Sequence, residues 1–130
     1  MSLKTVNTVL AALGALFILY VGVSYTLIPE SMAPNFGLSS WPQGDGDGFL
    51  VLKGVRDIVS GLILLVLLVT RHRRALGWVL LVEACTPIGD MMTILAHSGS
   101  TSAAVGIHGA TAAVMLATGL LILRETRDQS

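Results

Sequence analysis

The sequence GFLVLKGVRDIVSGLILLVLLVT at residues 48–70 joins two patterns that seldom occur together. Its second half is an apolar run of Ile, Leu and Val, as in a membrane-spanning helix, while its first half carries Lys53, Arg56 and Asp57. An ionisable side chain in hydrocarbon costs at least about 2.5–3.5 kcal/mol, so such side chains usually face a bundle interior and mark a site. We therefore expect a membrane helix whose polar face turns inwards.

The composition of the whole chain also indicates a membrane protein. With 130 residues, there is room for one domain. Charged residues make up 12 % of the chain, apolar residues 53 %, and the mean hydropathy is +0.77. A soluble domain carries about 25 % charged residues, so this chain has too little polar surface to cover itself in water. The formal net charge is zero, and we expect no nucleic-acid partner.

Four apolar stretches are each long enough to cross a hydrocarbon core, which takes about 20 helical residues. The stretches are residues 5–27, 48–70, 75–96 and 103–123. The first is longer than the core of a signal peptide and three more follow it, so we expect it to remain uncleaved. The sequence predicts an all-α fold, a four-helix bundle that forms one membrane domain over residues 1–130.

The basic residues outside these stretches predict the orientation. All six would lie on one side of the membrane, as the positive-inside rule requires of a cytoplasmic face. Both termini are therefore predicted to be cytoplasmic, and the absence of targeting features suits a bacterial inner (plasma) membrane. The six are Lys4, Arg71, Arg73, Arg74, Arg124 and Arg127.

Polar residues follow helical spacing within the predicted spans. Residues three or four positions apart lie on one helix face, and a rise of about 1.5 Å per residue sets their depth. The polar groups of all four spans meet in one layer between the midplane and the outer interface, where the first span contributes Tyr20 and Ser24. That layer holds Lys53, Arg56, Asp57, Ser60, Glu83, Thr86, Pro87, Asp90, His108, Thr111 and Met115.

The charges in this layer predict acid–base chemistry. Arg56 is expected to pair with Asp90 or Glu83, because a guanidinium binds carboxylates bidentately, and Lys53 can reach towards the interface. One carboxyl group, Asp57 or Glu83, would be left unpaired and protonated, and so able to act as a general acid. Asp90 or His108 would accept the proton, and Arg56 would hold the acid network or a substrate oxygen.

Proline and the long outer loop add features of a pocket. Pro87 has no N–H, so the carbonyl of Glu83 loses its helical partner and the helix should kink. Trp41 lies in the loop 29–47, which is long enough to cap a cavity. Together with Lys53, Tyr20 and Met115, Trp41 is predicted to contact the substrate.

The sequence Gly-Val-Arg-Asp at 54–57 and Gly-Asp at 89–90 resembles small four-helix membrane proteins related to the DoxX-like group. The resemblance extends to the layout of nearly the whole chain, with a long first loop, a basic second loop and a short third loop. It implies a four-helix bundle and draws attention to Arg56, Asp57 and Asp90. Many relatives are domains of unknown function, so the resemblance implies no reaction.

Three functions fit these patterns. The first is a membrane enzyme that isomerises, cyclises or opens an epoxide in a lipophilic small molecule by acid–base catalysis. No nucleotide-binding motif or zinc-ligand spacing is present, so a reaction without cofactor or metal is expected. The alternatives are a proton-coupled transporter of small molecules and a non-catalytic partner subunit whose ion pairs set assembly. A four-helix unit this small often assembles further, which leaves a homo-oligomer open.

Overall fold

The computed structural model describes residues 1–127, and the regular secondary structure of this part of the chain is entirely helical, with no strand. The all-α prediction is confirmed. The elements in order are α1 (Leu3–Leu27), α2 (Pro29–Phe36), α3 (Gly46–Val69), α4 (Arg73–Glu83), α5 (Cys85–Ala96), α6 (Thr101–Ala103), the π-helix η1 (Ala104–Gly109) and α7 (Ala110–Arg127).

Each stretch predicted to span the membrane forms a helix or a nearly continuous series of helices. Residues 5–27 lie in α1 and residues 48–70 correspond to α3 apart from its ends. Residues 75–96 are divided between α4 and α5, and residues 103–123 run through η1 into α7. These four stretches are therefore largely helical.

Three of these segments are long and apolar enough to cross a membrane. They are Leu3–Leu27, Arg73–Ala96 and Thr101–Arg127, with mean hydropathies of 2.1, 1.6 and 1.8. Together they indicate a membrane protein whose apolar helices associate with the bilayer. The helix α3 has 24 residues but contains Lys53, Arg56 and Asp57, which interrupt its apolar character.

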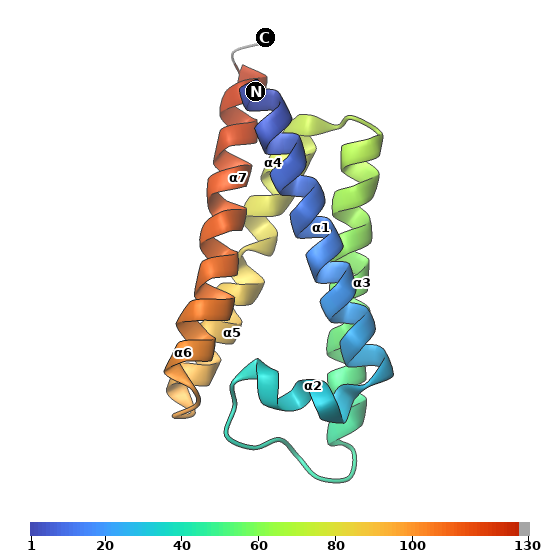
Figure 1. The fold of residues 1–130 in the computed structure, drawn as a ribbon, viewed down its shortest axis with the longest axis vertical. Helices are drawn as coiled ribbons and strands as arrows, with labels where there is room; N and C mark the ends of the chain where they lie inside the picture. Colours follow the sequence, from blue (N-terminus) through green and yellow to red (C-terminus); the bar gives the residue numbers. More distant parts are fainter. Residues whose placement is uncertain (128–130) are drawn as a thin grey trace.

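The loop after α1 is more ordered than predicted. Its first part forms α2, which begins with Pro29 at a position where the missing N–H costs no hydrogen bond. Gly37 ends this helix with φ +109°, a conformation that side chains other than glycine rarely adopt. The segment predicted as a long loop thus places a short helix across one end of the bundle (Figure 1).

The four long segments pack as two close pairs. The helix α1 packs mainly on α3, where a Cβ on Gly22 would lie only 2.7 Å from the carbonyl oxygen of Gly54. The helix α4 packs mainly on α7, where a Cβ on Gly119 would lie 2.9 Å from the carbonyl oxygen of Gly77. Glycine at these contacts allows the backbones to touch, as is common between membrane helices.

The two pairs converge at one end and diverge at the other (Figure 1). At the converging end, where α1 begins and α7 ends, Leu76, Leu80 and Ile122 join Ala11, Ala15 and Leu64 in a buried apolar core. At the diverging end, α2 lies across the space between the pairs (Figure 1). We call these the inner end and the outer end, respectively.

Candidate functional site

A cavity of about 550 Å³ lies between the two helix pairs. Much of its apolar wall comes from α1 and α7, whereas the charged side chains come from α3, α4, α5 and η1. It brings together six of the nine residues predicted to act on or contact a substrate, and Arg56, Tyr20 and Trp41 are the three that do not line it. The charged and polar wall consists of Lys53, Asp57, Ser60, Glu83, Thr86, Asp90, His108 and Thr111.

Lys53 and Asp57 form an ion pair in this wall. They are one helical turn apart on α3, with 2.6 Å between Lys53 Nζ and Asp57 Oδ2. The ammonium group also lies 4.6 Å from the ring centre of Tyr25, where the aromatic face attracts a cation. Instead of extending to the interface as predicted, the Lys53 side chain folds back onto Asp57.

Arg56 lies away from the cavity. Its side chain is exposed, and no ion pair involving Arg56 is formed within residues 1–127. The expected pairing of Arg56 with Asp90 or Glu83 is not observed. Successive helical residues point about 100° apart, so Arg56 cannot share the face of Asp57, the residue that follows it.

His108 joins the cavity wall to α2. Its Nε2 lies 2.9 Å from the carbonyl oxygen of Phe36, and its Nδ1 lies 3.5 Å from Asp90 Oδ2. A carbonyl oxygen only accepts hydrogen bonds, so Nε2 must carry a hydrogen. The carboxyl group of Asp90 faces the other ring nitrogen, Nδ1, at a distance longer than a hydrogen bond. We call these two residues the Asp90–His108 pair.

A local change of helix type accompanies His108. Residues 104–109 form a π-helix, in which one extra residue is accommodated within a turn. Such insertions are rare and occur frequently at functional sites. The ring of Phe36 packs edge-on against the imidazole with 4.9 Å between ring centres, so both the hydrogen bond and the ring contact hold His108 against α2.

Glu83 is the carboxyl group in the cavity wall without an ion pair in the described part of the chain. It is the last residue of α4, and the helix is interrupted at Ala84 before α5 begins. Pro87 supplies the cause, because its missing N–H leaves the carbonyl of Glu83 without a helical partner. Ser60 lies beside the Glu83 carboxyl group.

Of the four residues predicted to contact a substrate, two line the cavity and two do not. Met115 and Lys53 line the cavity. Tyr20 is 68 % exposed and does not line it, and Trp41 packs near Gly46 instead of reaching the cavity wall. Tyr25, which the sequence analysis did not select, is buried beside Lys53.

Comparison with known protein families identifies the chain. Residues 15–122 match the family described as domain of unknown function DUF4267. The chain belongs to the DUF4267 family. No curated protein and no solved structure matches it. The matched region of this DUF4267 protein contains every charged residue of the cavity wall.

A second buried polar cluster lies at the inner end of this DUF4267 protein. Arg73 donates to both carboxylate oxygens of Glu125, with 2.6 Å from Nε to Oε1 and 2.8 Å from Nη2 to Oε2. Asn7, which is fully buried, donates to Oε2 at 3.0 Å, and Arg73 Nη1 donates to Thr8 Oγ1 at 3.0 Å. We call Arg73, Glu125, Asn7 and Thr8 the inner cluster.

The inner cluster ties three helices together. Burial alone would raise the pKa of Glu125, which lies beyond the predicted span 103–123, but hydrogen bonds from Arg73 and Asn7 and the Arg73 charge outweigh it and lower that pKa. Glu125 and Asn7 both lie outside the region matched to DUF4267. The sequence analysis missed them because their contact joins residues 118 positions apart.

The described residues contain no group of three or more His, Cys, Asp or Glu side chains that could hold a metal ion. Asp90 and His108 are both potential ligands, but their contact is with each other.

Proposed function

We propose that this protein crosses the membrane four times, with both termini in the cytoplasm of a bacterial cell. In this topology α3 spans the membrane in addition to the three long apolar segments. The length of α3 and its glycine-mediated packing on α1 support this topology. All six basic residues outside the spans fall on the same side in this arrangement, as a cytoplasmic face requires. The resemblance to the DoxX-like group stays a prediction carried by Gly54, Arg56, Asp57, Gly89 and Asp90.

We further propose that the cavity binds a lipophilic small molecule and that its charged wall performs acid–base chemistry on it. The observation that carries this proposal is an apolar cavity of about 550 Å³ with a group of ionisable side chains in its wall. Ligand pockets typically measure about 300–1,000 Å³ and combine apolar walls with a few polar groups.

The cavity wall indicates how such a molecule would enter. Four apolar side chains on α1, η1 and α7 line the cavity and are also 45–60 % exposed: Leu13, Phe17, Ile107 and Val114. In a bilayer, these side chains would contact lipid. A substrate dissolved among acyl chains could then reach the cavity without passing through water.

The reaction that fits is a proton transfer with no net change in the protein. The pair formed by Asp90 and His108 would remove a proton from one position of the substrate. Glu83, protonated and without an ion pair, would donate a proton at another position, so that an isomer results. Lys53 would stabilise a developing negative charge on a substrate oxygen. The proton gained by the pair would then return to Glu83, directly or through solvent.

The test is conversion of a membrane-extracted molecule. Purified protein in lipid nanodiscs is incubated with an apolar extract of the source cells, and the products are compared by mass spectrometry. We expect the wild type to convert at least one compound into an isomer of equal mass. Glu83→Gln should slow that conversion by about 10²-fold or more, the usual contribution of a general acid.

The matched control is Glu30→Gln, the same change at a residue of α2 outside the cavity. It should convert at the wild-type rate. Conversion that is equally fast in Glu83→Gln would contradict the assigned role. The alternative outcome is that a pH gradient drives an unchanged compound across a liposome membrane. If Glu83→Gln abolished that movement, the protein would be a transporter and not an enzyme.

A further inference from the structure

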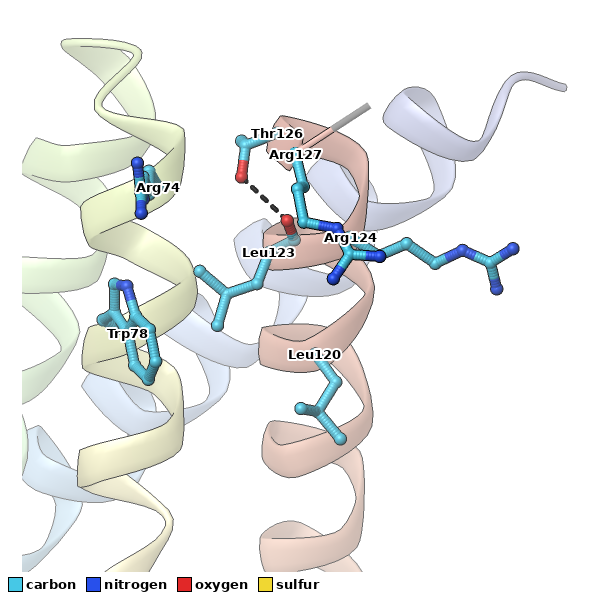
Figure 2. Close-up of a pocket in the computed structure, with 7 residues that line it drawn as sticks. All are labelled: Arg74, Trp78, Leu120, Leu123, Arg124, Thr126 and Arg127. Atoms are coloured by element: carbon cyan, nitrogen blue, oxygen red, sulfur yellow. Dashed lines mark hydrogen bonds between the residues drawn. The ribbon is translucent and has the colours of Figure 1, made fainter. Parts of the chain in front are cut away.

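A second cavity, of about 510 Å³, lies between α4 and α7 at the inner end. Figure 2 shows its residues: Arg74 lies one turn above Trp78 on α4, and the side chain of Leu123 reaches from α7 towards α4. The full lining consists of Arg74, Trp78, Leu120, Leu123, Arg124, Thr126 and Arg127. We call this the α4–α7 pocket. It shares no residue with the cavity between the two helix pairs.

Among residues 1–127, the lining has three arginines and no acidic residue. The nearby carboxylate of Glu125 does not neutralise Arg74 or Arg124, because Arg73 and Asn7 already hold both of its oxygens. In Figure 2, one arginine side chain of α7 extends away from α4. Exposed side chains change rotamer within picoseconds to nanoseconds, so a ligand can recruit it.

Polar and apolar residues of the pocket are separated along the helix axis. The arginines lie at the terminal turns of α4 and α7, whereas Leu120 and Trp78 lie one turn further into the bundle and are 59 % and 55 % exposed. A phospholipid has the same order, with a charged phosphate above acyl chains. Tryptophan is enriched at this level of the membrane.

We propose that the α4–α7 pocket binds the headgroup of an anionic phospholipid of the cytoplasmic leaflet. Arg74 and Arg124 would contact the phosphate, and Leu120, Leu123 and Trp78 would contact the upper acyl chains. Basic pockets between membrane helices on the cytoplasmic side are suited to such lipids. This proposal rests on the membrane topology proposed above and is independent of the acid–base chemistry.

Trp78 provides a probe inside the pocket. The chain has two tryptophans, so in the Trp41→Phe protein all indole fluorescence comes from Trp78. This protein is placed in phosphatidylcholine vesicles that contain a small fraction of either brominated phosphatidylglycerol or brominated phosphatidylcholine. Bromine quenches fluorescence on contact, and the ratio of the two quenching efficiencies measures the preference for the anionic lipid.

We expect phosphatidylglycerol to quench several-fold more effectively than phosphatidylcholine. An arginine near the surface contributes up to about fivefold, so Arg74→Gln with Arg124→Gln should remove most of this preference. The matched control is Arg71→Gln, which removes an exposed arginine at the same end that does not line the pocket. It should leave most of the preference intact.

Three outcomes would overturn the proposal. Equal quenching by the two lipids would show that Trp78 contacts the bilayer without a headgroup site, leaving the topology valid. Absence of quenching by either lipid would refute the membrane placement as well. Complete displacement of brominated phosphatidylglycerol by glycerol 3-phosphate would assign the pocket to a soluble phosphate compound.

Discussion

The two ends of this bundle both bury charged residues but use them differently. At the inner end, Arg73 and Glu125 form a two-point ion pair and neither lines a described cavity. At the outer end, five ionisable side chains surround about 550 Å³ of space, and Glu83 among them has no ion pair in residues 1–127. The number of buried charges therefore does not distinguish the two ends. The presence of an unpaired charged group beside a cavity does, and our proposal for the outer end rests on it.

The largest effect should come from breaking the inner cluster. Arg73→Met leaves the 5 % exposed Glu125 carboxylate without its cation, and loss of one partner of a buried pair costs about 3–5 kcal/mol. Unfolding in detergent, followed by circular dichroism, measures this loss. The neighbouring exposed residue supplies the control, Arg74→Met.

A double variant sharpens the same comparison. Replacing both partners, Arg73→Met with Glu125→Leu, removes the uncompensated charge and should recover most of the lost stability. A double variant as unstable as Arg73→Met would contradict the assignment of the loss to an uncompensated Glu125 charge.

Much of this contrast could be predicted from sequence, and the missing part has a geometric cause. The apolar stretches predict the helices, and spacing of three and four places Asp57, Glu83, Asp90 and His108 at one level. Pairing needs the rotation of each helix about its axis, which the sequence does not specify. Arg56 was misassigned for this reason.

Contacts between segments far apart in the chain were the other feature that could not be predicted from the sequence. Tyr20 and Tyr25 lie about 140° apart on a helix, and only the face defined by Ala11, Ala15 and Gly22 could have selected Tyr25. The inner cluster needs the relative register of α1 and α7, which no local pattern encodes.

A smaller effect is expected from detaching α2. His108→Phe removes the hydrogen bond to the carbonyl oxygen of Phe36, which should cost about 1–2 kcal/mol because a part-buried acceptor loses its donor. Hydrogen exchange should speed up in residues 29–36. His97→Phe is the control, since exposed His97 contacts its own helix through Thr93. Equal exchange in the two variants would exclude α2 as part of the outer site.

The pH dependence of stability should separate the two ends further. The pKa of Glu125 is lowered in the folded protein, so the carboxylate stabilises the fold above its ordinary pKa of 4.5 and loses this contribution as the pH falls through that value and below. The difference in unfolding free energy between the wild type and Glu125→Gln should become smaller on acidification. Thermal unfolding from neutral pH down to below the folded-state pKa measures this difference. A constant difference would contradict the assigned pairing.

The smallest effect on stability should come from Glu83→Gln. Because Glu83 has no ion pair to lose, the free energy of unfolding should change by about 0.5 kcal/mol or less, as for substitutions away from stabilising contacts. Thermal unfolding of Glu83→Gln and Arg73→Met under the same conditions measures this change in free energy. A loss approaching that of Arg73→Met would place Glu83 among the structural charges.

The most direct test of the outer site is occupancy of the cavity, measured by native mass spectrometry of protein extracted from its own membrane. Gly106 lines the cavity, and a Cβ added there would meet nothing within 4 Å, so Gly106→Leu adds volume without a clash at Cβ. Gly89→Leu makes the same change, also without a clash at Cβ, outside the cavity. We predict that wild type and Gly89→Leu retain an apolar molecule and that Gly106→Leu loses it. Equal retention in all three, or none in any, would contradict a binding site at the outer end.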